Sequence, residues 1–269
     1  MIDACQHSCA NSHSHSVRRL GDALRAQSSC PDRAWDALWR TSAHAFALTP
    51  ANSAATTLDL GALETALLKT DFKPLLPTAL AGAVRRRQLS YLGGRLCAER
   101  ALAQIDRNAA GPERGADGEP LWPVAMRGSI THTEEYAHAV ALEAQQCSGI
   151  GIDSERIVAS AREIIAFCCT PFERRTWFAG ADEPLRATVL FSAKESFYKA
   201  IYPIVKRFVD FDEIEVVSWD EARAEIVMQP TVTSDWSSID CVRARYQIDV
   251  SGLASVHTAV LLPAISSPP

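Results

Sequence analysis

The sequence predicts an α+β fold, which could consist of two similar halves although no sequence repeat relates them, and three observations point to this class. Apolar residues recur at helical spacing from about residue 78 to 105 and again from about 161 to 202. Short strand patterns occur near residues 129–153, and a longer series of them runs from 214 to 262. The order helix, strands, helices, strands is typical of α+β proteins and places the junction of the two halves near residue 150.

Composition excludes several classes of protein. The chain has 269 residues, of which 47% are hydrophobic, so it can bury a sizeable core. A formal net charge of -5 provides no global basic field, so we expect no nucleic-acid partner. No run reaches the roughly 18 to 20 apolar residues of a membrane-spanning helix, and the N-terminus lacks the apolar core of a secretory signal. We therefore expect a cytoplasmic protein without a membrane partner, whose eight cysteines are reduced.

Residues 1–56 are expected to form a partly disordered N-terminal extension rich in Ser, Ala, Cys and His. Only residues 31–46 show amphipathic helical spacing, carried by Trp35, Leu38, Trp39 and Phe46. Metal ligation by the first cysteines and histidines is one reading, but their spacing fits no closed zinc template, and flexible tails often carry such residues. These residues are Cys5, His7, Cys9, His13 and His15.

The first half, residues 57–148, begins with helical spacing. Residues 78–105 predict one long helix or two in tandem. A turn-rich loop without helix or strand is expected at 108–122, followed by a turn and a strand over 129–142. The loop is interrupted by Gly111, Pro112, Gly115, Gly118 and Pro120.

The second half, residues 149–265, begins with a short apolar strand at 150–153. Helices are expected at about 161–178 and 183–202. The period then changes to that of antiparallel strands at 214–217, 224–228, 242–250 and 256–262.

Two carboxylates follow the strand at 150–153. Asp153 and Glu155 are two residues apart, so both project from the same side of the strand. Mg²⁺ prefers oxygen ligands and usually takes one or two carboxylates, so the pair is a candidate Mg²⁺ site. A solvated strand end would show the same pattern.

A second charged pair lies in the helix at 183–202. Glu195 and Lys199 are four residues apart and share one face, as a metal-bridged phosphate site requires. An ordinary surface ion pair would have the same spacing. The flanking aromatic residues favour the first interpretation, because charges on a mostly buried helix need partners.

Phosphate-binding candidates lie in the first half. Ser129, Thr131 and His132 close a Gly-led turn, and Arg87 and Arg95 flank a Gly pair on the early helix. A structural histidine and a solvated arginine face are the alternatives. Cys97, Cys168 and Cys169 have apolar neighbours and are expected in the core.

Taken together, these motifs resemble the 4'-phosphopantetheinyl transferases, specifically the bacterial surfactin-type and enterobactin-type group. The resemblance runs from about Arg85 to Tyr202. Its strongest parts are Ile150-Gly151-Ile152-Asp153-Ser154-Glu155 and Phe191-Ser192-Ala193-Lys194-Glu195-Ser196-Phe197-Tyr198-Lys199, with support from Arg87 through Arg95, Trp122-Pro123 and Gly128 to His132.

The resemblance implies two α+β halves related by a pseudo-two-fold axis, with the active site in the cleft between them. It implies Mg²⁺-dependent transfer of phosphopantetheine from coenzyme A to a serine of an acyl or peptidyl carrier protein, with release of adenosine 3',5'-bisphosphate. The metal ligands implied are Asp153, Glu155 and Glu195, and these residues with Lys199 form the catalytic set. Coenzyme A would contact Arg87, Arg95, Ser129, Thr131, His132, Asp153, Lys194 and Lys199.

Several points are left open by the resemblance. Glu195, Glu155 or a metal-bound water could act as general base. The family's basic residue before the Pro of the loop is missing at Asp117-Gly118-Glu119-Pro120, where Arg114 is a possible substitute, and Phe191 stands where Trp is commoner.

Two fused halves would already contain the intersubunit cleft, so we expect a monomer. An acidic carrier protein would need a local patch, with candidates at Arg174, Arg175, Lys206 and Arg207. A non-catalytic module that binds coenzyme A or a carrier protein is the alternative function.

Overall fold

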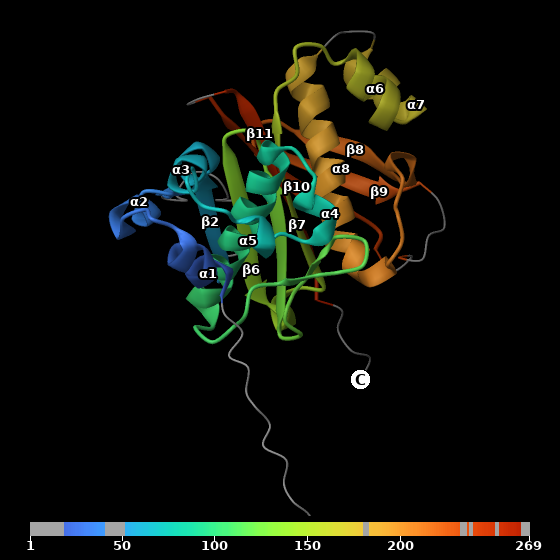
Figure 1. Ribbon diagram of the computed structural model, residues 1–269. Helices are drawn as coiled ribbons and strands as arrows, with labels where there is room; N and C mark the ends of the chain where they lie inside the picture. Colours follow the sequence, from blue (N-terminus) through green and yellow to red (C-terminus); the bar gives the residue numbers. More distant parts are fainter. Residues whose placement is uncertain are drawn as a thin grey trace, which may run out of the picture.

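The computed structural model describes residues 19–40, 52–179, 183–231, 236, 239–250 and 253–264. These residues form two larger antiparallel sheets that lie beside each other, each with one long helix packed against it (Figure 1). The strand order is β1-β2-β6-β5 in the first sheet and β7-β11-β10-β9-β8 in the second. The predicted α+β class is therefore confirmed.

The first sheet and its helices are built from the N-terminal part of the chain. The helices are α1 (Leu20–Gln27), α2 (Asp32–Asp36), α3 (Leu60–Ala66), α4 (Thr78–Ala81) and α5 (Arg85–Ile105), with 3-10 turns η1 (Lys73–Leu75) and η2 (Ala144–Gln146). The strands are β1 (Trp39–Arg40), β2 (Ala54–Asp59), β5 (Met126–His132) and β6 (Tyr136–Glu143). A separate ribbon pairs β3 (Glu113–Arg114) with β4 (Pro120–Leu121).

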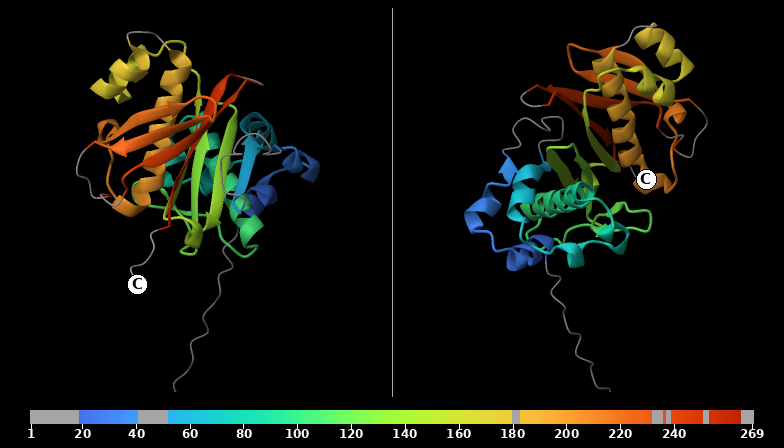
Figure 2. Two further views of the ribbon diagram at one scale, coloured as in Figure 1. Left: turned by 180° about the vertical axis from the view of Figure 1, so that it is seen from behind. Right: turned by 45° about the horizontal axis from the view of Figure 1, so that its top comes forward.

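The second sheet and its helices follow. The strands are β7 (Gly149–Arg156), β8 (Ile214–Asp220), β9 (Glu225–Pro230), β10 (Val242–Asp249) and β11 (Ser255–Leu262). The helices are α6 (Arg162–Cys168), α7 (Pro171–Glu173) and α8 (Pro184–Val205), with the π-helical turn η3 (Arg174–Phe178) and the 3-10 turn η4 (Phe211–Glu213). Figure 2 shows α5 and α8 lying against their respective sheets.

Three local predictions are wrong. In the described part of the helix expected over 31–46, only α2 is helical, because the chain extends into β1 after a turn, and residues 41–46 lie outside the described residues. The expected loop at 108–122 contains the two-stranded ribbon β3–β4. The turn between the two strands includes Gly118, whose φ of +94° glycine adopts without steric strain. Residues 129–132 belong to strand β5 and pair with β6 instead of closing a turn. The tandem helices at 78–105 and the strands of the second half are confirmed.

Part of the predicted extension packs on the first sheet. Leu24, Trp35 and Leu38 are at most 3% exposed and share a core cluster with residues of α5. The carboxylate of Glu99 on α5 also accepts the backbone N–H of Leu20 at 2.8 Å. The metal-ligand candidates Cys5, His7, Cys9, His13 and His15, and Phe46 of the predicted helix, lie outside the described residues.

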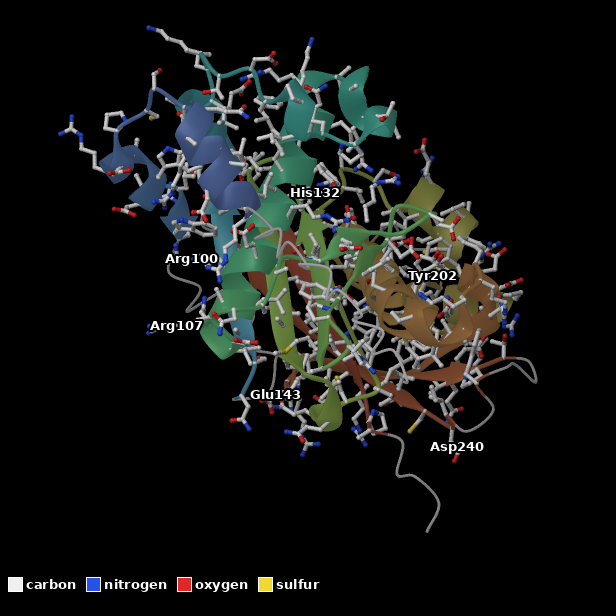
Figure 3. The ribbon with its side chains drawn as sticks, turned by 60° about the horizontal axis from the view of Figure 1, so that its bottom comes forward. Arg100, Arg107, His132, Glu143, Tyr202 and Asp240 are labelled. Carbon is white, nitrogen blue, oxygen red and sulfur yellow. The ribbon has the colours of Figure 1, made fainter. Side chains whose placement is uncertain are left out.

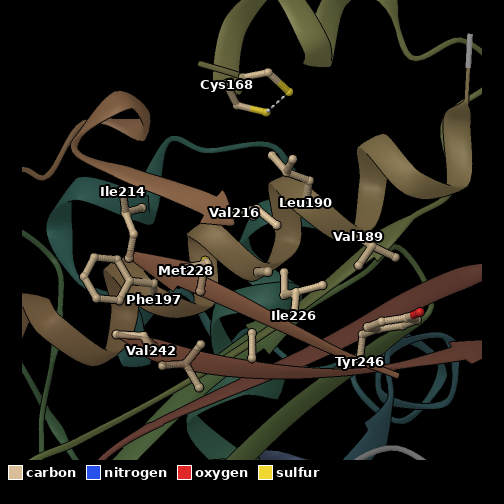
Figure 4. Packing of buried hydrophobic residues seen from close by; sticks show 14 of the residues in the cluster. Cys168, Val189, Leu190, Phe197, Ile214, Val216, Ile226, Met228, Val242 and Tyr246 are labelled. Atoms are coloured by element: carbon tan, nitrogen blue, oxygen red, sulfur yellow. Dashed lines mark hydrogen bonds between the residues drawn. The ribbon is translucent and has the colours of Figure 1, made fainter. Parts of the chain in front are cut away.

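The second core lies between α8 and the second sheet (Figure 4). Leu190 and Phe197 of α8 are at most 1% exposed and pack with Val216 and Met228 of the sheet. Each of the six described cysteines is a free thiol. Among the residues that the structure describes, no helix combines the length and apolarity needed to cross a bilayer.

Helix α8 approaches β7 so closely that only glycine fits beneath it. A Cβ atom on Gly151 would overlap the carbonyl oxygen of Ser196 and lie 2.8 Å from the backbone nitrogen of Ala200. A Cβ on Gly149 would overlap the carbonyl oxygen of Ala200. The Gly-x-Gly pattern before Asp153 therefore fixes how α8 and β7 approach each other.

Gly151→Ala is expected to destabilise the protein by about 1–3 kcal/mol or more, because helix backbone has no room to yield. Gly82→Ala is the matched control, since a Cβ there meets nothing within 4 Å. The control should leave the free energy of unfolding unchanged or raise it by up to about 1 kcal/mol. Urea unfolding of both variants tests this, and equal stabilities would contradict the packing described.

Candidate active site

The site is organised around the buried carboxylate of Asp153, which is 3% exposed. Its Oδ1 accepts hydrogen bonds from Lys199 Nζ at 2.6 Å and Thr131 Oγ1 at 3.2 Å. Its Oδ2 accepts one from Ser192 Oγ at 2.9 Å. These partners come from α8 and β5, so β7, α8 and the first sheet meet at this carboxylate.

Ser129 and Thr131 join the two sheets. Ser129 Oγ accepts the N–H of Ile152 at 3.0 Å, and Thr131 Oγ1 accepts the N–H of Ser154 at 3.1 Å. Both hydroxyl groups are buried, and the hydrogen bonds that they accept link β5 to β7. Thr131 therefore joins the two sheets, and its predicted contact with coenzyme A stays a prediction, whereas Ser129 also borders a hollow described below.

Glu155 and Glu195 lie beside this network. Burial and the nearby negative charge of Asp153 raise the pKa of Glu155 to about 7. Burial also raises the pKa of Glu195, an effect that Lys199 opposes and Asp153 reinforces. The charges of Asp153, Glu195 and Lys199 therefore all act on Glu155, whereas the shared role predicted for these four residues stays a prediction.

The donor set fits a hard cation in its chemistry. Carboxylate oxygens are the ligands that Mg²⁺ prefers, and burial, reinforced by the negative charges of Asp153 and Glu195, favours the protonated form of Glu155 when no cation is bound. Among the described residues, no group of three or more His, Cys, Asp or Glu side chains is arranged as a ready metal site. The cationic group beside the Asp153 carboxylate in this structure is Lys199 Nζ, which lies 2.6 Å from Oδ1.

A basic hollow of about 420 Å³, here called the arginine hollow, lies at the Glu155 end of β7. Arg87 Nη1 is 3.4 Å from His132 Nε2 on its wall. Burial, together with the positive charges of Lys199 and Arg87, lowers the pKa of His132, so its imidazole is neutral at pH 7. The charged or titratable groups that line the hollow are Arg86, Arg87, His132, Glu134, Glu155 and Arg156.

A second hollow of about 540 Å³, here called the tyrosine hollow, lies at the other end of β7. Tyr202 Oη donates to Asp117 Oδ2 at 2.7 Å, which ties the loop of the first half to α8. Figure 3 labels Tyr202 and His132, which mark the two hollows. Lining residues used below are Trp122, Ser129, Tyr198, Lys199, Tyr202 and Ile204.

Arg95 does not join Arg87. Its Nη1 donates to the carbonyl oxygens of Pro112 at 2.6 Å and Glu113 at 2.8 Å, and its guanidinium lies 5.2 Å from the ring centre of Tyr91. It lines neither hollow. Its Nη1 therefore holds the loop before Trp122, and its predicted contact with coenzyme A stays a prediction.

Lys194, another predicted coenzyme A contact, is buried within the protein. It is 2% exposed, and its Nζ donates to Glu173 Oε2 at 2.8 Å and to the carbonyl oxygens of Cys168 and Phe211. All three ammonium donors are therefore used on the side of α8 that faces away from the carboxylates. Glu173 in turn accepts the backbone N–H groups of Thr170 and Val216.

Three residues around the site were not predicted from the sequence, namely Ser192, Arg86 and Arg156. Ser192 lies three and seven residues before Glu195 and Lys199, so helical spacing alone would have placed it on the same face. Arg86 and Arg156 line the arginine hollow, but each is next in sequence to a predicted residue and gave no separate signal.

Two buried histidines lie behind the site where the sheets adjoin. His138 of β6 and His257 of β11 are 2% and 3% exposed, with ring centres 5.3 Å apart. Nδ1 of His138 is 3.0 Å from Thr57 Oγ1, and Nδ1 of His257 is 2.9 Å from Ser154 Oγ. Burial lowers the pKa of His138 to about 3 and also lowers that of His257.

Two stretches of the chain are similar to known protein families. The family model for the 4'-phosphopantetheinyl transferase N-terminal domain matches residues 76–142, and the model for the 4'-phosphopantetheinyl transferase superfamily matches residues 149–251. The 4'-phosphopantetheinyl transferase PptT of Mycobacterium tuberculosis is 32% identical over 196 residues, which cover 68% of this chain and 82% of that protein.

Other relatives are similar to different extents. Enterobactin synthase component D of Salmonella typhi is 32% identical over 200 residues, covering 67% of this chain and 83% of that protein. The 4'-phosphopantetheinyl transferase Npt of Nocardia iowensis is 32% identical over 138 residues, or 51% of this chain. The chain spans only 62% of Npt and 57% of the Streptomyces mobaraensis transferase Svp.

Lys194→Met is expected to lower the free energy of unfolding by about 3–5 kcal/mol, because it leaves the Glu173 carboxylate buried without its cation. Arg243→Met is the control, since it breaks an exposed ion pair with Glu225 and should cost at most about 1 kcal/mol. Urea unfolding measures both. A Lys194→Met protein of unchanged stability that binds coenzyme A poorly would restore the predicted phosphate contact.

Stability is expected to fall as the pH drops below 6.5, in part because of His138. Below that pH the unfolded chain binds a proton on this imidazole, whereas the folded protein does so only near its pKa of about 3. The stabilisation is thus complete above pH 6.5 and is lost by up to about 1.4 kcal/mol per pH unit as the pH falls. Urea unfolding from pH 7 to 5 should show a shallower pH dependence for His138→Gln, and identical slopes would contradict this assignment.

Proposed function

The chain belongs to the 4'-phosphopantetheinyl transferase superfamily, in the group that includes enterobactin synthase component D, and from this premise we propose its reaction. It transfers the 4'-phosphopantetheine group of coenzyme A to a serine of an acyl or peptidyl carrier protein. The observation that carries the proposal is the ion pair of Asp153 with Lys199, whose charges also act on Glu155 and Glu195, beside two hollows.

The two hollows suit the two ends of coenzyme A. The arginine hollow offers guanidinium groups to the phosphorylated nucleotide, and the tyrosine hollow offers apolar rings to the long pantetheine arm. Ile150 borders one hollow and Glu155 the other, about 17 Å apart at the rise of a strand. The diphosphate would then lie between them, beside the carboxylates and Lys199.

In the proposed reaction the serine oxygen attacks the phosphorus that carries the pantetheine arm. A new P–O bond forms, the P–O bond of the diphosphate breaks, and adenosine 3',5'-bisphosphate leaves with the bonding electrons. The serine proton passes to a base, for which Glu155, Glu195 and a metal-bound water remain the candidates.

Each residue of the site has a proposed task. Lys199 places its ammonium beside the diphosphate, and Arg87 with neutral His132 donates hydrogen bonds to the nucleotide phosphates. Asp153, Glu155 and Glu195 would hold Mg²⁺, which when bound neutralises charge on the diphosphate. Because protons compete for Glu155, with its pKa of about 7, cation affinity should increase as pH rises through that value.

We extend the proposal to the rest of the protein's organisation. Residues 57–148 and 149–265 would be pseudo-two-fold related halves, supported by one long helix against one antiparallel sheet in each. The active site would occupy the cleft between them in a cytoplasmic monomer. Its carrier proteins would serve nonribosomal peptide, polyketide or siderophore synthesis, and one similar protein is named enterobactin synthase component D.

Intact-mass spectrometry of an apo carrier protein incubated with this protein, coenzyme A and Mg²⁺ tests the reaction. We expect the carrier to gain the mass of one phosphopantetheine group, and EDTA to abolish the gain. Glu195→Gln should lower the rate at least 100-fold, because it removes a carboxylate that the reaction requires. The exposed Arg223→Ala variant is the control and should retain full activity.

The alternative is a module that binds coenzyme A or a carrier protein without turnover. It would be supported if several apo carrier proteins gained no mass although coenzyme A still bound. Activity that survives both EDTA and Glu195→Gln would instead contradict the proposed roles of Mg²⁺ and the carboxylates.

A further inference from the structure

We propose that Arg156, the last residue of β7, is a further phosphate-binding residue that holds the 3'-phosphate of coenzyme A. This inference rests on the proposed function and adds a contact from the second half of the molecule. The first half already supplies Arg86 and Arg87 of α5 and His132 of β5 to the arginine hollow. Arg156 faces them as the basic side chain that the described part of the second half contributes.

The charges of the hollow support this assignment. Three arginines and one histidine surround about 420 Å³, whereas the acidic groups on its wall are Glu134 and Glu155. Glu155 belongs to the carboxylate cluster, which leaves Glu134 to balance the arginines at the rim. A phosphate dianion is the ligand that such an excess of guanidinium groups recognises, because each fork can donate two parallel hydrogen bonds.

Glu134 shows where the arginine side chains meet. Its carboxylate is 2.5 Å from Arg86 Nη2, and both side chains are about half exposed. A hydrogen bond from Arg86 and, more weakly, the positive charge of Arg156 hold the pKa of Glu134 below its usual range. The positive charges of arginines from α5 and from β7 therefore both act on one carboxylate at the rim of the hollow, and a phosphate bound there would meet the same charges.

The place of Arg156 in the fold indicates which phosphate it would hold. Asp153 and Glu155 precede it on β7, and the diphosphate is proposed to lie beside them and Lys199. Arg156 lies beyond Glu155, at the end of the strand that is farthest from the tyrosine hollow. The phosphate at that end of coenzyme A is the one on the ribose.

Isothermal titration of the full-length protein with two probes tests this. Adenosine 3',5'-bisphosphate carries the phosphate in question, whereas dephospho-coenzyme A lacks it. Arg156→Ala should weaken binding of the bisphosphate about tenfold and change binding of dephospho-coenzyme A less than twofold. Arg156→Lys should recover part of the loss, because it keeps the charge but not the fork.

Two further variants sharpen the result. Arg223→Ala removes an exposed arginine at the far β8–β9 turn and should leave both affinities unchanged. Glu134→Gln should tighten binding of the bisphosphate severalfold, because it removes the carboxylate that pairs with Arg86 and offsets part of the charge of Arg156.

The outcomes separate this inference from the proposed reaction. Unchanged binding of the bisphosphate by Arg156→Ala, or an equal loss for both probes, would overturn the assignment even if the protein modifies carrier proteins. An Arg156-dependent preference for the bisphosphate would support it even if no carrier protein is modified, in which case the proposed reaction alone would fail.

Discussion

The buried carboxylate of Asp153 is the constraint on which the rest of the structure depends. A carboxylate removed from water costs several kcal/mol unless charged and hydrogen-bonding partners surround it. Here the partners are Thr131 of β5 and Ser192 and Lys199 of α8. The hydrogen bonds of this carboxylate can therefore form only when β5 of the first sheet, β7 and α8 are all in place. The contacts that stabilise the junction between the sheets are also the contacts that set the geometry of the site.

Helix α8 serves two purposes on two faces. Ser192, Glu195 and Lys199 face the carboxylate cluster, whereas Lys194 points into the second core and meets Glu173. The close approach of α8 to β7 over Gly151 fixes the depth at which both sets of side chains lie. A shift of this helix would move the site residues and break the buried ion pair together.

Local pattern was enough to predict much of the fold and the core of the site. Helical spacing located α5 and α8, and the alternation of strand residues brought Asp153 and Glu155 to one side. The two charged residues that the structure places away from their predicted role share a cause, since their partners lie far away in sequence. Lys194 binds a carboxylate 21 positions away, and Arg95 binds carbonyl groups 17 and 18 positions away. Only the folded chain determines whether such a charge faces ligand or protein.

The distribution of charge around β7 separates two tasks under the proposed function. The carboxylate cluster is negative despite Lys199, so it repels a diphosphate until a cation offsets its charge. The arginine hollow lies at the Glu155 end of the same strand, and its guanidinium groups would attract phosphate without a metal ion. Nucleotide binding and chemical transfer consequently depend on different groups, and a change in metal content should act on the rate of transfer far more than on retention of the nucleotide. Glu155 borders both regions, and because its pKa is raised to about 7, its charge changes with pH near neutrality.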